Sequence, residues 1–181
     1  MVARLIHLNG PPGVGKSTLA RRYAQSHSGT VRLDPDELRE LVSGWAAESA
    51  EATDAAREMA QAAARCYLER GDVVLPQMAL RESDLDRLYR VAESAGAELW
   101  SILLMDDLDV LVQRCRDRQA GGHRPVVTPM EIHRVRTELL RLAADKQLPV
   151  IHRDRLSGAD DLAALLDQAP AAASMSVGRV S

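Results

Sequence analysis

A nine-residue segment constrains this chain more than any other part of its sequence: Gly10-Pro11-Pro12-Gly13-Val14-Gly15-Lys16-Ser17-Thr18. It has Gly, four residues, Gly, Lys and then a hydroxyl residue, and it lies between an apolar run at 5–8 and a helical pattern at 17–25. Glycines allow backbone N–H groups to converge on phosphate oxygens, and the positive end of the following helix points to the same place. The segment therefore predicts a phosphate-binding loop.

Lysine is rare in this chain, which makes its place in the loop informative. Of 23 basic residues only Lys16 and Lys146 are lysines. An ordinary glycine-rich turn does not explain why one of them stands where a phosphate contact is needed. We expect Lys16 to reach the β- and γ-phosphates of a nucleotide and the Ser17 hydroxyl to ligate Mg²⁺. All the residues from Gly10 to Thr18 are expected to contact the nucleotide.

The rest of the chain alternates short apolar runs with longer amphipathic stretches, as parallel strands and crossover helices do. We predict strands at 5–8, 30–33, 72–75, 98–105 and 149–152. Helices are predicted at 17–25, 35–42, from after Gly44 to about 70, and at 83–95, 108–119, 128–145 and 160–168. This order predicts an α/β fold, a three-layer α/β/α sandwich with a five-stranded parallel sheet. Residues 1–168 form one expected domain, and 169–181 an expected flexible tail.

Some packing can also be predicted from the pattern. The long helix before Gly71 repeats apolar residues at spacings of four, three and four, which predicts one buried stripe: Ala55, Met59, Ala62 and Cys66. We expect Cys66 and Cys115 to be packed thiols, since neither has metal-ligand spacing or a disulfide-rich context. His7 alternates into the first strand and is expected to be packed there.

Composition and charge exclude several classes of function. With 23 Lys and Arg against 26 Asp and Glu, the net charge of −3 gives no basic field, and aromatic residues are only 3% of the chain without any Phe. Nucleic acid is therefore an unlikely partner. No apolar run approaches the roughly 18 to 20 residues that cross a bilayer, and the first residues do not have the order of a secretory signal. We expect a cytoplasmic protein without a membrane partner.

A second motif follows the second predicted strand: Arg32-Leu33-Asp34-Pro35-Asp36-Glu37-Leu38-Arg39. Together with residues 10–18 it resembles the small P-loop kinases, which include AAA_33-like proteins, shikimate kinase, gluconate kinase, chloramphenicol phosphotransferase and polynucleotide kinase. The specific match covers roughly the first 45 residues. The resemblance implies the P-loop NTPase fold of the nucleoside and shikimate kinase type, with ATP and Mg²⁺. It also implies a lid at about 114–129.

In those kinases an aspartate matching Asp36 contacts the substrate hydroxyl and can accept its proton. One matching Asp34 can help to hold Mg²⁺ through water, so both are candidate substrate-site residues. The residues also have a structural interpretation, because Asp34 is placed to cap a helix that starts at Pro35, and Asp36 is favoured in its first turn. A cap can also be a ligand, so both roles stay open.

The chain departs from many P-loop enzymes after the third predicted strand. Where they carry an aspartate for the Mg²⁺ shell, this sequence continues with Pro76-Gln77. Either Asp34 takes that role, or Gln77 contacts substrate from the strand end. Arg81 is placed to meet an anionic group of the substrate, or it is a surface residue.

Arginines before and within the expected lid are candidates for the transferred phosphate. Arg114 and Arg118 lie one helical turn apart, with Arg116 turned away, and Arg124 follows in the loop. A guanidinium here can clamp the γ-phosphate as charge spreads over its oxygens. The alternative is a solvated helix in which Arg114 pairs with Asp117.

These inferences favour an ATP-dependent kinase that phosphorylates a hydroxyl of a small molecule. Small size and the lack of a guanine-reading Asn-Lys-x-Asp segment disfavour mechanical ATPases and GTPases. Two alternatives stay open: a polynucleotide 5′-hydroxyl kinase, and a nucleotide-binding regulatory or toxin-like protein with little turnover. The acceptor has no readable signature; we expect residues 38–65 and the loop around Gln77 to form its pocket. The protein is expected to be a monomer, or a homodimer through the helix at 52–70.

Overall fold

The structure is a computed structural model that describes residues 2–42, 50–120, 127–156 and 158–168. Its sheet has five strands in the order β2-β3-β1-β4-β5, all parallel. The strands are β1 (Arg4–Asn9), β2 (Val31–Arg32), β3 (Val73–Pro76), β4 (Glu98–Met105) and β5 (Val150–His152). The predicted five-stranded parallel sheet is confirmed, and β2 is shorter than predicted.

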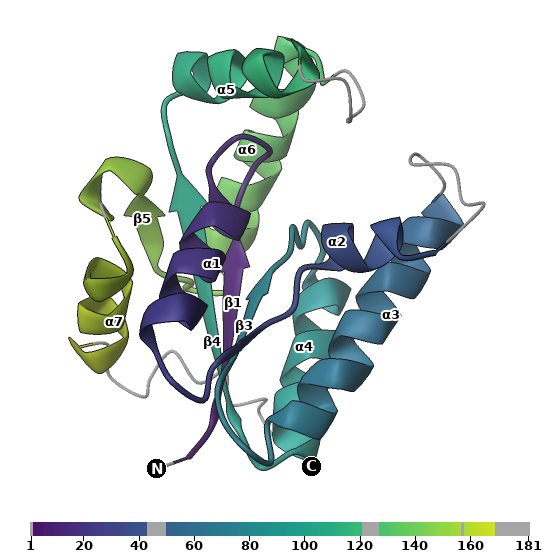
Figure 1. Ribbon diagram of the computed structural model, residues 1–181. Helices are drawn as coiled ribbons and strands as arrows, with labels where there is room; N and C mark the ends of the chain where they lie inside the picture. Colours follow the sequence, from purple (N-terminus) through teal and green to yellow (C-terminus); the bar gives the residue numbers. More distant parts are fainter. Residues whose placement is uncertain (1, 43–49, 121–126, 157, 169–181) are drawn as a thin grey trace.

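Helices cover both faces of this sheet (Figure 1). They are α1 (Lys16–Ser26), α2 (Pro35–Glu40), α3 (Ala50–Tyr67), α4 (Glu82–Ser94), α5 (Leu108–Ala120), α6 (Pro129–Asp145) and α7 (Ala159–Gln168), with a 3₁₀ turn at Arg153–Arg155. The predicted α/β/α sandwich is therefore confirmed. The tail at 169–181 lies outside the described residues, and so do the lid residues 121–126 with Arg124. No helix of the described segments is both long and apolar enough to cross a bilayer.

The alternation of side chains along β1 separates the core into two sides. Ile6 and Leu8 pack with residues of α1 and α7, whereas Leu5 packs with residues of α3 and α4. This follows from the period of two in a strand, which places successive side chains on opposite faces. β1 is the central strand, and helices cover both faces of the sheet around it. The carboxyl end of β1, where the glycine-rich loop begins, is therefore held in a fixed position.

The buried stripe of α3 differs from the predicted one. Met59 is exposed, and the buried residues are four alanines at a spacing of four: Ala52, Ala56, Ala60 and Ala64. The prediction was wrong because it favoured the larger apolar side chains. A stripe of methyl groups lets the helix approach its neighbours α2 and α4 closely, so small size decides which face is buried here.

The two cysteines have different environments. Cys115 is buried, as predicted, but Cys66 is exposed and the prediction that it is a packed thiol is wrong. Cys66 was predicted to belong to the buried stripe of α3. Because the buried stripe consists of other residues, Cys66 lies on the exposed face of the helix.

His7 is fully buried in the middle of β1 and links three strands. Its Nε2 lies 2.9 Å from the backbone carbonyl oxygen of Gln77, and its Nδ1 lies 2.8 Å from the Ser101 hydroxyl. A carbonyl only accepts, so Nε2 carries the proton and Nδ1 accepts from the hydroxyl. Burial lowers the pKa of His7 to about 4. A neutral imidazole thus holds the backbone of Gln77 just beyond β3.

This lowered pKa predicts acid sensitivity. The unfolded chain takes up a proton on His7 below pH 6.5, whereas the folded chain does so only near pH 4. Stability is therefore lost as the pH falls through this interval, by roughly 3 kcal/mol at pH 4. We expect His7→Gln, which cannot titrate, to be less stable than the wild type at pH 7 and to lose this disadvantage towards pH 4. Urea unfolding at a series of pH values measures the difference. A gap that stays constant with pH would contradict the assignment.

Candidate active site

The glycine-rich loop joins β1 to α1 and depends on three left-handed glycines. The φ angles of Gly10, Gly13 and Gly15 are 149°, 88° and 92°. A Cβ on Gly10 would lie 2.6 Å from the carbonyl oxygen of Leu104, and one on Gly13 would lie 2.8 Å from that of Leu111. Other residues are therefore excluded by both conformation and space. The loop leads directly into the N-terminus of α1, so the amides of the first helical turn and the helix dipole face the same point.

Lys16 crosses back over this loop. Its Nζ donates to the carbonyl oxygens of Gly10 and Pro11 at 2.7 and 3.1 Å. The ammonium group is thus held at the mouth of the loop, where it can contact phosphate oxygens. Ser17 follows in the first turn of α1. The structure places the most distinctive residues of the motif at a single point, as the sequence predicts.

Asn9 anchors the start of the loop and was not recognised from the sequence. Its side-chain oxygen accepts from the amides of Gly10 at 2.8 Å and of Ala79 at 3.0 Å, and its Nδ2 donates to the Ala79 carbonyl oxygen at 2.9 Å. This side chain is buried, and it ties the end of β1 to the segment after β3. Gln77 lies in that segment, so Asn9 also fixes how it sits beside the loop.

Asp34 caps a helix, as one of its two interpretations predicts, and it also contacts the residue that we expect to ligate Mg²⁺. It caps α2 by accepting from the amide of Asp36 at 3.1 Å, and it hydrogen-bonds the side chain of Ser17. Only 5% of the residue is exposed. Burial raises the pKa of Asp34, and the hydrogen bond from Ser17 opposes this effect. The carboxylate is thus adjacent to the hydroxyl that we expect to ligate Mg²⁺.

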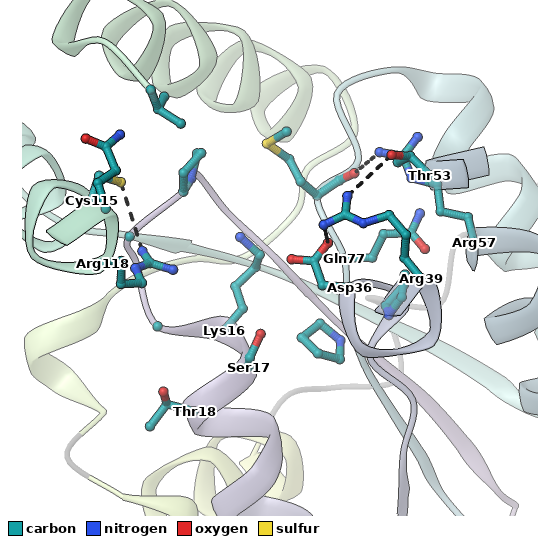
Figure 2. Close-up of a pocket in the computed structure, with 18 residues that line it drawn as sticks. Lys16, Ser17, Thr18, Asp36, Arg39, Thr53, Arg57, Gln77, Cys115 and Arg118 are labelled. Atoms are coloured by element: carbon teal, nitrogen blue, oxygen red, sulfur yellow. Dashed lines mark hydrogen bonds and ion pairs between the residues drawn. The ribbon is translucent and has the colours of Figure 1, made fainter. Parts of the chain in front are cut away.

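A cavity of about 340 Å³ opens at the carboxyl ends of the strands, in front of the loop. It is lined by residues from the loop and α1, from α2 and α3, from the end of β3, and from α5. Figure 2 shows Lys16 and Ser17 in the middle, with Asp36, Arg39, Thr53, Arg57 and Gln77 on one side and Cys115 and Arg118 on the other. Open parallel sheets bind ligands at this edge.

The cavity brings together most, but not all, of the predicted site residues. Lys16, Ser17, Asp36, Gln77 and Arg118 line it, with Pro12, Gly13, Gly15 and Thr18 of the loop. Asp34 is not among the lining residues, but its carboxylate hydrogen-bonds the side chain of Ser17, which is. Arg81 does not line it: this residue is exposed at the start of α4, where its amide donates to Asp84 at 3.2 Å. Of the two interpretations of Arg81, the structure favours the surface residue.

Arg114 contacts the loop from outside the cavity. Its Nη1 lies 2.8 Å from Asp106 Oδ2 and 3.5 Å from the Gly13 carbonyl oxygen. Asp117, the partner proposed for it in a solvated helix, instead accepts from Gln113 at 2.8 Å. Asp106 is buried directly after β4 and was missed. Its position at the end of a predicted strand, 98–105, was the available signal in the sequence.

Arg118 reaches the cavity from the same helix. Its Nε donates to the carbonyl oxygen of Arg114 at 3.3 Å, and a Cβ on Gly13 would lie 3.4 Å from its Nη2. The guanidinium is thus directly over the loop. The two arginines have different surroundings, since Arg118 faces the cavity, whereas Arg114 contacts the loop directly and is paired with Asp106.

Three cavity residues had no signal in the sequence: Arg39, Thr53 and Arg57. All three lie in the stretch 38–65 that was expected to form the acceptor pocket. Which residues of that stretch line the cavity depends on how α2 and α3 pack against each other. Arg39 Nη1 donates to the Thr53 hydroxyl at 3.4 Å. The cavity thus has a cationic wall opposite Arg118.

The residues present fit a Mg²⁺ ion that is held mainly by phosphate oxygens. Ser17 supplies a hydroxyl at the helix N-terminus, and the buried carboxylate of Asp34 is hydrogen-bonded to it. Among the described segments there is no group of three or more His, Cys, Asp or Glu side chains with metal-binding geometry. Ser17 and Asp34 are the residues that would hold the ion.

A protein-family model described as AAA domain (AAA_33) matches residues 5–142 of the chain. The match includes the glycine-rich loop, both aspartates after β2, and the arginines of α5. No curated protein sequence matches at a significant level.

Several solved structures share the fold. A tunicamycin resistance protein from Deinococcus radiodurans is 22% identical, with a TM-score of 0.61 over 91% of this chain and 95% of that one. A candidate kinase from Chloroflexus aurantiacus is 20% identical, with a TM-score of 0.71 over 93% and 98%. A chain of the Pnkp1/Rnl/Hen1 RNA repair complex is 23% identical, with a TM-score of 0.65, and this chain spans 46% of its length. At these identities the likeness establishes the fold.

The raised pKa of Asp34 predicts a stabilising substitution. Ionisation of a buried carboxyl whose folded pKa lies above its unfolded value costs stability as the pH rises. Asparagine avoids this cost and still caps a helix. We expect Asp34→Asn to be at least as stable as the wild type at pH 7, and to lose any advantage below pH 4. Thermal and urea unfolding measure this.

The matched control is Asp34→Ala, which removes the charge and the cap together. It should be about 1 kcal/mol less stable than Asp34→Asn. If the two variants are equally destabilised at pH 7, burial of the charge is not the dominant effect.

Proposed function

The chain belongs to the AAA domain family of P-loop, kinase-like proteins, and from this premise we propose that it transfers the γ-phosphate of ATP to a hydroxyl group of a small molecule. One observation carries the proposal. A single cavity holds the glycine-rich loop, with Lys16 and Ser17, and the carboxylate of Asp36 from the next helix. A phosphate donor and a hydroxyl acceptor can therefore meet there without a large rearrangement of the chain.

The loop and Lys16 would bind the donor. The backbone amides at the start of α1 and the Lys16 ammonium supply positive charge around the β- and γ-phosphates. Ser17 and Asp34 would hold Mg²⁺, which would supply positive charge near the transferred group. Asp34 orients the Ser17 hydroxyl from behind and favours a cation at that point.

Asp36 would act on the acceptor. It extends from the first turn of α2, directly after the end of β2, and its carboxylate lies 3.8 Å from Arg39 Nη2. A carboxylate here can orient the attacking hydroxyl and accept its proton as the new bond to phosphorus forms. Arg39 contacts this carboxylate, and both side chains line the cavity.

Arg118 would stabilise the transferred group. Its guanidinium lies over the loop, on the side of Lys16 away from Asp36 (Figure 2). A fixed fork of N–H donors is most effective where negative charge develops during the reaction. Arg114, which the sequence favours as much as Arg118, is paired with the buried Asp106 and is better suited to position the loop.

The proposal predicts separable effects of two substitutions. Lys16→Ala should reduce phosphate transfer at least 100-fold with the fold retained, because the ammonium contacts the transferred group. Asp36→Asn should lower kcat 100-fold or more while ATP affinity changes less than threefold. Steady-state kinetics and circular dichroism measure both. Full activity of Asp36→Asn would remove the assigned base. Arg65→Ala, an exposed position of α3, is the control.

The activity itself is tested by an acceptor screen with ATP and Mg²⁺. ADP release is measured with each candidate hydroxyl compound and compared with the rate of ATP hydrolysis without acceptor. We expect acceptor-dependent release with a small molecule. Release only with a 5′-hydroxyl oligonucleotide, weakening steeply with salt, would indicate the polynucleotide kinase instead. Slow ATP turnover whatever the acceptor would favour the nucleotide-binding regulatory protein.

A further inference from the structure

One end of the cavity holds groups that binding of ATP does not use. We call it the acceptor end and define it by Asp36, Arg39, Thr53, Arg57 and Gln77. Figure 2 shows these side chains gathered on the side of Lys16 and Ser17 opposite to Arg118. They come from α2, α3 and the segment after β3, so three elements that are distant in sequence converge there.

The two arginines of the acceptor end are held in place by long contacts. Arg39 lies 3.8 Å from Asp36 and 3.4 Å from the Thr53 hydroxyl. Arg57 lies 3.6 Å from Asp54 and 3.5 Å from the Met78 carbonyl oxygen. Charge-assisted hydrogen bonds are normally about 2.7–2.9 Å long. Both guanidinium groups are thus oriented by the protein while keeping the capacity to bind a closer anionic partner.

Their burial makes that capacity significant. The side chains of Arg39 and Arg57 are 18% and 29% exposed. Within the described segments, the charged residues that line the cavity are four cations, Lys16, Arg39, Arg57 and Arg118, and one carboxylate, Asp36. Lys16 and Arg118 flank the loop that receives the polyphosphate. At the acceptor end two guanidinium groups therefore face one lining carboxylate, while Asp54, the partner of Arg57, is 67% exposed and outside the cavity. A bound anion is favourable in such a partly desolvated place.

Gln77 adds a requirement of a different kind. It is 5% exposed, and its side-chain oxygen is buried without a hydrogen-bond partner within the described residues. Its backbone is fixed, because the carbonyl oxygen accepts from His7 Nε2 at 2.9 Å. A buried acceptor that lacks a donor costs about 1–3 kcal/mol. The Gln77 side chain lines the cavity, so a turn of its terminal amide would bring this oxygen to a ligand O–H or N–H group, which would recover that cost.

We infer that the acceptor is a small hydroxylated acid. Its carboxylate or phosphate binds between Arg39 and Arg57, a second hydroxyl or amino group donates to Gln77 Oε1, and the reacting hydroxyl lies beside Asp36. This inference rests on the proposed kinase function. In the reaction the acceptor oxygen forms a bond to the γ-phosphorus, the bond from that phosphorus to the bridging β,γ-oxygen breaks, ADP leaves with its electron pair, and the acceptor proton passes to Asp36.

A binding experiment tests the anion site without any turnover. The protein is saturated with ADP and Mg²⁺, so that the glycine-rich loop is filled, and its thermal unfolding is followed with added malonate or inorganic phosphate at constant ionic strength. We expect malonate or phosphate, or both, to raise Tm. A larger shift with malonate would indicate that the acceptor carries a carboxylate, and a larger shift with phosphate that it carries a phosphate. The shift should be lost in Arg39→Gln and Arg57→Gln, be partly restored in Arg57→Lys, and persist in Arg65→Gln.

The outcomes separate this inference from the proposed function. An anion shift that is absent from the wild type, or that is equal in all the variants, overturns the anion site. A shift that depends on Arg39 and Arg57 supports it, even if ADP and Mg²⁺ fail to stabilise the protein, a result that would count against the kinase alone. Unfolding without ligand shows whether each variant is folded.

A kinetic experiment tests the same site in transfer. Matched pairs of compounds that differ in one acidic group, such as glycerate with glycerol and gluconate with sorbitol, are compared by kcat/KM for ADP release. We expect the acid of a pair to be preferred at least tenfold. Arg57→Gln should remove that preference, and Gln77→Leu should raise KM for the acid about tenfold, both without changing KM for ATP. A preferred neutral acceptor that is unaffected by Arg57→Gln overturns the inference and leaves the kinase intact.

Discussion

The close approach of the glycine-rich loop to the end of β4 is the constraint on which the rest of the site depends. The Cα of Gly10 packs so near the carbonyl oxygen of Leu104 that no side chain can be accommodated there. This contact requires β1 to lie beside β4 and to end at a definite point. The buried side chain of Asn9 secures that end by pairing with the backbone of Ala79. A loop that binds phosphate with its amides thus depends on a rigid sheet.

The same arrangement joins the two halves of the cavity. His7 and Asn9 are near neighbours on the central strand, and both hold the backbone that follows β3. Gln77 is consequently fixed to the strand from which the glycine-rich loop begins. The glycine-rich loop and the acceptor end are therefore both attached to β1, and the buried hydrogen bonds of the His7 and Asn9 side chains fix their separation. Such positioning is what transfer between two bound molecules requires.

Several groups in the site are kept at a cost to stability. Burial of the Asp34 carboxyl disfavours its ionised form and raises its pKa. The side-chain oxygen of Gln77 is buried without a hydrogen-bond partner among the described residues. Neither feature is needed for the fold, because asparagine also caps helices and an apolar residue can fill a buried position. Unfavourable local choices of this kind concentrate at functional sites. Both groups lie within a few residues of strand ends, on the cavity side of the sheet.

The sequence by itself determined the glycine-rich loop, the five parallel strands, and the helix that begins at Pro35, because each is encoded by local patterns of glycine, apolar alternation and capping. Only the tertiary structure decided that α3 buries alanines, that Asp106 binds Arg114, and that Arg39 and Arg57 line one cavity with Gln77. These depend on how closely helices approach one another and on which residues of different elements converge. Contacts of this kind leave no periodic pattern in the sequence. They depend on the shapes and charges that distant segments present to each other in the folded chain.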